Sequence, residues 1–193
     1  MLKIKDTDCP VYLLGAKEKI PVLNNNGIII RQGAFGSGEH ETTKSCLKNF
    51  RLLDFKDKSV LDIGCGTGIL GIAAEKSGAS FVAGFDISYN ACRTAKENFL
   101  INNTQINHVI NSDDAGIKGK YDIIVANIYY DIIISLYQLM KDSLLSQGYL
   151  VLSGIPVEYN FDARKMFADK GHFELVKNEM LEEFSTIVLK KGD

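Results

Sequence analysis

The stretch VLDIGCGTGILG, residues 60–71, joins an apolar run to four closely spaced glycines. An apolar run that ends in glycine is typical of a buried parallel strand, and the apolar residues that follow it are typical of a helix. A glycine-rich turn between a strand and a helix lets the backbone approach a ligand closely. The stretch therefore predicts a ligand site. Its glycines fit two spacings, G-x-G-x-G from Gly64 and G-x-G-x-x-G from Gly66.

Two acids near the glycines help to separate the ligands that these spacings suggest, S-adenosylmethionine and a dinucleotide such as NAD. Asp62 lies where a carboxylate can reach an ammonium group but would repel a pyrophosphate. Asp86 ends the next apolar run and can accept hydrogen bonds from ribose hydroxyls, which both ligands carry. A chain of 193 residues also leaves little room for two mononucleotide-binding halves and a substrate domain. We expect S-adenosylmethionine, with an NAD(P)-binding oxidoreductase as the alternative.

Short apolar runs alternate with helical patterns through most of the chain. Strands are expected at 59–64, 81–86, 108–112, 121–127 and 148–154, and helices at 68–79, 88–99, 133–144 and 158–170. This alternation predicts an α/β fold with a Rossmann-like seven-stranded mixed sheet and helices on both faces. Residues 172–180 and 184–192 are expected to add an antiparallel strand pair at the edge.

The amino-terminal part of the chain carries weaker signals. A helix is expected over 40–54, and a β-hairpin around the NNNG turn at 24–27. We expect a short lead-in over residues 1–33 and one domain over residues 34–193, with no linker between further domains.

The stretch AFGSGEHETT, residues 34–43, places two close glycines directly before a helix. One interpretation is a flap over the ligand, in which Phe35, Gly36 and Thr43 contact it. The other is an ordinary flexible entry with a threonine near the helix start. Further along, Asp113 and Asp114 follow the third strand, where an acid can accept from an adenine amino group, and Asp114 is the better candidate. The alternative is a solvated turn.

The stretch ANIYY, residues 126–130, ends a strong strand. Asn127 would then lie at the carboxyl edge of the sheet and direct its amide into the ligand crevice. Tyr129 and Tyr130 could form the wall of an acceptor pocket. Many amino-group methyltransferases have Asn/Asp-Pro-Pro-Tyr here, and this chain keeps only the first and last letters. The alternative is a helix-capping asparagine with two packing tyrosines.

Composition and charge exclude several classes of protein. A formal net charge of −2 gives no basic surplus for a nucleic-acid backbone, so we predict no direct nucleic-acid binding. Neither a leader pattern nor a membrane-spanning apolar run is found, so we expect a cytoplasmic protein without a membrane partner. No cysteines lie at C-x-x-C spacing and the three histidines are scattered. We therefore expect reduced thiols and no metal site.

Several stretches together resemble the ribosomal protein L11 methyltransferase (PrmA) family. Its members read much like F-G-T-G-x-H-x-T-T, V-L-D-x-G-C-G-S-G-I-L, G-x-D, V-A-N-I and L-S-G-I. This sequence has FGSGEHETT, VLDIGCGTGIL, GFD, VANI and LSGI, over roughly residues 33–155. The glycine motif is shared by many methyltransferases, whereas FGSGEHETT at this distance upstream is much more specific.

The resemblance implies a class I S-adenosylmethionine-dependent methyltransferase. Its substrate would be a protein, such as a ribosomal large-subunit protein, methylated on lysine or amino-terminal amines. Family members typically carry a separate amino-terminal domain that docks the ribosomal protein, and 33 residues are too few for it. The residues NIYY also depart from the family's NILA. A small-molecule N- or O-methyltransferase, with residues 1–33 as a lid, is the alternative.

The resemblance implies cofactor contacts at Thr43, Gly64, Asp86 and Asn127. An in-line displacement at a methyl carbon mainly requires positioning, so we expect no dedicated base. The candidate catalytic residues are Asn127, which would orient the acceptor amine, and Tyr130. The full set of candidate cofactor-binding residues is Phe35, Gly36, Thr43, Asp62, Gly64, Gly66, Gly68, Asp86, Ile87, Asp114 and Asn127.

Overall fold

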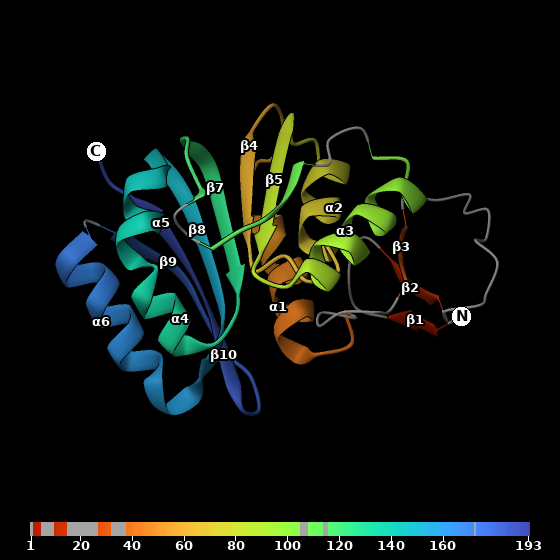
Figure 1. The fold of residues 1–193 in the computed structure, drawn as a ribbon. Coiled ribbons are helices and arrows are strands. Elements are labelled where there is room, and N and C mark those ends of the chain that lie inside the picture. Colours follow the sequence, from red (N-terminus) through yellow and green to blue (C-terminus); the bar gives the residue numbers. More distant parts are fainter. Residues whose placement is uncertain are drawn as a thin grey trace.

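The computed structural model describes residues 2–4, 10–14, 27–31, 38–104, 108–113, 116–171 and 173–193. The main sheet of this described part has seven strands in the order β6-β5-β4-β7-β8-β10-β9 (Figure 1). The strands are β4 (Ser59–Ile63), β5 (Phe81–Asp86), β6 (His108–Asn111), β7 (Tyr121–Asn127), β8 (Leu144–Pro156), β9 (Phe173–Met180) and β10 (Phe184–Lys191). Strands β4 to β8 pair in parallel, which confirms the predicted α/β fold.

The last two strands form the predicted antiparallel pair at one edge of the sheet. Strand β10 inserts between β8 and β9 and is antiparallel to both, so only β9 lies at the edge. Strand β10 is buried along most of its length, whereas β9 is largely exposed. A buried central strand and an exposed edge strand are consistent with their apolar and mixed compositions.

The helices divide between the two faces of the sheet (Figure 1). Helices α1 (Glu41–Asn49), α2 (Ile69–Lys76) and α3 (Tyr89–Ile101) cover one face, and α4 (Tyr130–Ser135), α5 (Tyr137–Ser143) and α6 (Asn160–Gly171) cover the other. Strand residues alternate between the two cores: Val60 packs with the first set of helices and Leu61 with the second. Two 3-10 segments, η1 (Phe50–Leu52) and η3 (Val157–Tyr159), extend α1 and precede α6. No helix among the described residues is long and apolar enough to span a membrane.

The prediction of one continuous helix over residues 133–144 was wrong, because this segment forms two short helices. Helix α4 ends at Ser135, and α5 begins at Tyr137. Leu136, between them, donates its N–H to the carbonyls of Ile132 and Ile134, which tightens the chain locally. The expected apolar face is nevertheless buried, and Leu144 belongs to β8 rather than to a helix. Periodicity therefore identified the inward residues but not the break.

A second sheet holds β1 (Leu2–Ile4), β2 (Val11–Leu14) and β3 (Ile28–Arg31). Strand β1 is antiparallel to β2, whereas β3 is parallel to β2. The strands of a hairpin are antiparallel, whereas β2 and β3 are parallel, so these two strands do not form the predicted β-hairpin. The turn residues 24–26 lie outside the described residues. Ile28 and Ile30 belong to the same core as α1 to α3, and the division at residue 33 stays a prediction.

Candidate ligand pocket

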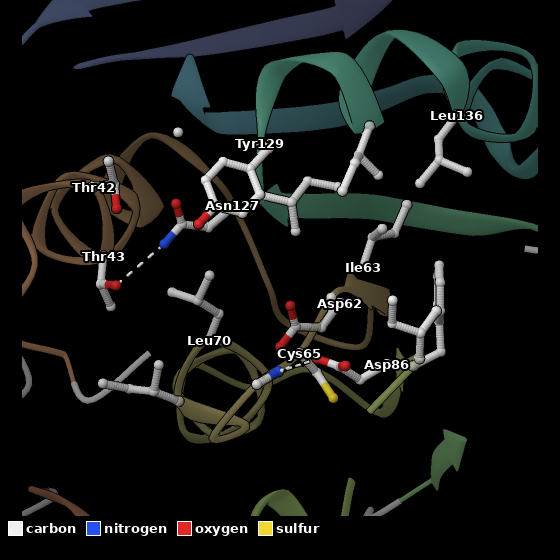
Figure 2. A pocket seen from close by; sticks show the side chains of 18 of the residues that line it. Thr42, Thr43, Asp62, Ile63, Cys65, Leu70, Asp86, Asn127, Tyr129 and Leu136 are labelled. Atoms are coloured by element: carbon white, nitrogen blue, oxygen red, sulfur yellow. Dashed lines mark hydrogen bonds between the residues drawn. The ribbon is translucent and has the colours of Figure 1, made fainter. Parts of the chain in front are cut away.

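A pocket of about 720 Å³ lies at the carboxyl ends of β4, β5 and β7 (Figure 2). Strand β4 lies between β5 and β7, where the order of the parallel strands reverses. Ligands of doubly wound sheets bind in a crevice at this point. The amino-terminal end of α1 and the start of β10 also contribute to the wall, through His40, Thr42, Thr43 and Phe184.

The first two glycines of the motif line the pocket. Gly64 and Gly66 adopt φ values of +66° and +54°, which disfavour residues with a side chain. A Cβ atom on Gly64 would lie 2.4 Å from Ile128 Cγ2, so no other residue fits without movement of that side chain. The backbone of this turn is therefore directly accessible to a ligand.

The last two glycines serve packing. Gly68 precedes α2 with φ +79° and is not among the residues that line the pocket. A Cβ atom on Gly71 would lie 3.0 Å from Phe99 and 3.2 Å from Val82. The helix therefore needs glycine here to approach the sheet, and this accounts for the apparent G-x-G-x-x-G spacing.

Asp62 is buried beneath the glycine turn, with 2% of its surface exposed. Its Oδ2 accepts a hydrogen bond from the Gly71 N–H at 3.1 Å. Burial raises the pKa of Asp62 from 3.8 to about 7; the Gly71 hydrogen bond lowers it, and the charge of Asp86 raises it further. The carboxylate lines the pocket, so a cation in the pocket would favour its ionised form.

Asp86 ends β5 and lines the same pocket. Its Oδ2 accepts from the Gly66 N–H at 3.0 Å, and its Oδ1 accepts from the Ser88 N–H at 2.8 Å. These bonds fix the carboxylate between the glycine turn and the start of α3. Ile87 follows it and lines the pocket with 78% of its surface exposed. An apolar side chain this exposed on a pocket wall is available to cover a ligand.

Thr43 on α1 and Asn127 at the end of β7 meet on the opposite side of the pocket (Figure 2). The Asn127 Nδ2 donates to the Thr43 Oγ1 at 3.2 Å. Thr43 is 1% exposed, so the hydroxyl is held by packing. This bond uses one of the two N–H groups of the Asn127 amide and orients the side chain, which lines the pocket at the carboxyl edge of the sheet.

Helix α1 is held in place by two carboxylates. Glu41 accepts the backbone N–H of Glu182 at 3.1 Å and those of Glu183 and Phe184 at 3.3 Å. Glu179 accepts from Ser45, Lys48 and Asn49 of the same helix. The Glu41 carboxylate, by binding the Phe184 N–H, holds Phe184 at the pocket, where its ring centroid lies 5.3 Å from that of His40. The sequence analysis did not identify His40 or Phe184 as a candidate site residue.

The structure places most of the predicted residues at one site. Those that line the pocket are Thr43, Asp62, Gly64, Gly66, Asp86, Ile87 and Asn127. Phe35, Gly36 and Asp114 lie outside the described residues, whereas Asp113, the less favoured acid, lines the pocket. Within the described part of the chain, no group of three or more His, Cys, Asp or Glu side chains is arranged to hold a metal ion.

The two tyrosines of ANIYY point to different places. Tyr129 lines the pocket and is 68% exposed. Tyr130 is not among the lining residues and instead stacks on Tyr159, with 4.8 Å between ring centroids and 5° between planes. Its predicted catalytic role has no support from this position and stays a prediction, whereas Tyr129 is placed to border a substrate.

Comparison with known proteins places this pocket in a family. The family model described as ribosomal protein L11 methyltransferase (PrmA) matches residues 14–192. The chain belongs to the PrmA family. This confirms the resemblance that the sequence motifs indicated.

Proteins of similar sequence and a solved structure of similar fold carry related names. A ribosomal protein L11 methyltransferase of Campylobacter concisus is 38% identical over 160 residues, covering 83% of this chain and 56% of that protein. One from Caldanaerobacter subterraneus subsp. tengcongensis is 39% identical over 159 residues, covering 82% and 51%. A crystal structure of a ribosomal protein L11 methylase from Lactobacillus delbrueckii subsp. bulgaricus is 26% identical, with a TM-score of 0.86 and 99% of both chains covered. The chain spans about half the length of the curated relatives it matches.

Proposed function

We propose that this chain binds S-adenosylmethionine and transfers its methyl group to amino groups of a protein, with a ribosomal protein as the favoured substrate. The observation that carries the proposal is the pocket itself. It joins two glycines of positive φ, two carboxylates and the Thr43–Asn127 pair at the carboxyl edge of the sheet. Membership of the PrmA family supports this assignment.

The residues of the pocket fit this ligand. Gly64 and Gly66 leave the turn without side chains, and Asp86 offers carboxylate oxygens to ribose hydroxyls. Asp62 offers a negative charge to a cationic ligand group. A volume of about 720 Å³ lies within the range of small-molecule sites.

The protein's part in the reaction is to position the acceptor. When bound, S-adenosylmethionine supplies a methyl group already activated by the positive charge on sulfur. The Asn127 amide, turned by its bond to Thr43, would orient the acceptor amine. Tyr129 and Phe184 border the pocket and would exclude water. A lysine amine loses its proton more readily in such surroundings, because desolvation disfavours the ammonium form.

The test supplies the purified chain with isotopically labelled S-adenosylmethionine and three acceptors: intact ribosomes, free ribosomal proteins and a small-molecule extract. We expect label in a ribosomal protein, recovered after digestion on lysine or an amino-terminal residue. Label only in small molecules would reject the protein substrate. Calorimetric titration with S-adenosylhomocysteine and with NADH tests the ligand class separately, and binding of NADH alone would reject the methyltransferase.

A further inference from the structure

Asn98 on α3 and Asn102, which directly follows this helix, hold the edge of β3 that faces away from β2. The Asn98 Oδ1 accepts from the Arg31 N–H at 2.8 Å, and the Asn98 Nδ2 donates to the Arg31 carbonyl at 3.2 Å. Asn102 repeats this pattern with Ile29, at 2.9 and 2.7 Å. Each side-chain amide pairs with one backbone residue as a neighbouring strand would. Helix α3 lies beside the small sheet (Figure 1).

Asn98 also reaches the glycine turn. Its Nδ2 donates to the Thr67 carbonyl at 2.9 Å, so its two N–H groups serve Arg31 and Thr67. Thr67 is fully buried and lies between Gly66 and Gly68, which both have positive φ. The turn is closed by one internal bond, from the Gly68 N–H to the Cys65 carbonyl at 2.7 Å, and the glycines on either side of Thr67 leave its backbone otherwise weakly restrained. The hydrogen bond from Asn98 to the Thr67 carbonyl therefore helps to fix the conformation of the turn.

Asn102 provides a natural comparison. Its Nδ2 donates to the Ile29 carbonyl and to the Asn98 carbonyl at 2.8 Å, which accounts for both of its N–H groups. It therefore shares the contact with β3 and lacks the contact with the turn. The two side chains are one helical turn apart, and both are buried.

We infer that Asn98 is a positioning residue for the pocket, through which β3 and the glycine turn are held in one arrangement. The inference rests on the proposed binding of an S-adenosyl ligand. The carbonyl that Asn98 holds belongs to the residue after Gly66, which lines the pocket and donates its N–H to Asp86. Without that bond the turn samples other arrangements, and ligand affinity falls in proportion to the competent fraction.

The experiment compares Asn98→Ala with Asn102→Ala by calorimetric titration with S-adenosylhomocysteine. Both variants lose two hydrogen bonds to β3, and only Asn98→Ala also loses the bond to Thr67. We expect the Kd to rise about tenfold in Asn98→Ala, or about 1.4 kcal/mol, and less than about twofold in Asn102→Ala. In turnover assays the KM for S-adenosylmethionine should rise in Asn98→Ala, with kcat at saturation nearly unchanged.

Equal changes of Kd in the two variants would overturn the inference and leave both asparagines with a structural role. No binding of S-adenosylhomocysteine by the wild-type chain would instead overturn the proposed function, and the inference with it. Should Asn98→Ala not fold, hydrogen exchange on the wild-type chain decides. Ligand binding should then protect the Arg31 amide, bonded to Asn98, more than the Ile29 amide. Protection of the Gly68 amide without that difference would overturn the inference.

Discussion

Replacing Asp62 with asparagine separates the charge of this side chain from its hydrogen bond. Asp62 is 2% exposed, and its Oδ2 accepts from the Gly71 N–H at 3.1 Å. An asparagine carbonyl oxygen can accept the same bond and has nearly the same shape. The variant Asp62→Asn therefore removes the charge and leaves the packing in place. Burial, opposed by the Gly71 bond and reinforced by Asp86, raises the pKa of the carboxyl from 3.8 to about 7.

This raised pKa makes the stability of the ligand-free protein depend on pH with a defined sign. Between the unfolded and folded pKa values, the folded protein keeps a proton that the unfolded chain has released, so the free energy of unfolding falls as pH rises. The contribution is fully present below about pH 4 and is lost as pH rises through about pH 7. A difference of about three pKa units corresponds to about 4 kcal/mol, of which about 2.5 kcal/mol falls between pH 5 and pH 8.

The assay is urea unfolding of the wild-type chain and Asp62→Asn at these two pH values, without ligand. Taking the difference between the proteins cancels the other titrating groups. We expect Asp62→Asn to gain about 2.5 kcal/mol over the wild type on going from pH 5 to pH 8. Asp62→Ala is the control: it should show the same pH trend but lower stability, because it also loses the bond to Gly71. If the difference in free energy of unfolding between Asp62→Asn and the wild type is the same at pH 5 and pH 8, the reasoning is refuted.

Three further substitutions test the site. Gly64→Ala should abolish binding of S-adenosylhomocysteine in calorimetry, because its Cβ would lie 2.4 Å from a side-chain carbon of Ile128; Gly78→Ala, also at positive φ but outside the pocket, should leave binding intact. Asn127→Ala should lower turnover at saturating S-adenosylmethionine roughly 100-fold, by losing orientation of the acceptor, and undiminished turnover would reject that role. Glu41→Ala should lower the free energy of unfolding in urea by about 1 kcal/mol, since three N–H groups lose their acceptor, and an unchanged value would show that water replaces it.

The polar part of the pocket could be predicted from sequence because its signals are local. Each buried parallel strand is a short apolar run, and the residue at its carboxyl end must face the ligand edge. Asp86 and Asn127 were found by this rule, and both line the pocket. Ser88 also shows a local signal: it caps α3 by accepting from the Ala91 N–H at 3.3 Å, and serine is a preferred residue at a helix start.

The apolar part of the pocket depends on long-range pairing, which no local pattern reveals. Phe184 reaches the wall because β10 inserts between β8 and β9 and because Glu41 binds the turn before it. The position of Tyr130 follows from the start of α4, where successive residues turn to different faces, so adjacent tyrosines could not both face the ligand. The parallel pairing of β2 with β3 is also a long-range choice, and the turn residues between them gave no indication of it.

The two carboxylates of the pocket, Asp62 and Asp86, also determine whether ligand affinity rises or falls with pH. Burial, with a smaller contribution from the charge of Asp86, raises the pKa of Asp62, so ionising this carboxyl in the ligand-free pocket is unfavourable. A ligand with net positive charge offsets this cost, and its affinity should rise as pH increases through about 7 and Asp62 ionises. A dinucleotide pyrophosphate would add negative charge, and its affinity should fall over the same interval. The glycine spacings of residues 60–71 left two ligand classes open. The pH dependence of binding separates them, because the ionised Asp62 carboxylate attracts a cationic ligand and repels an anionic one.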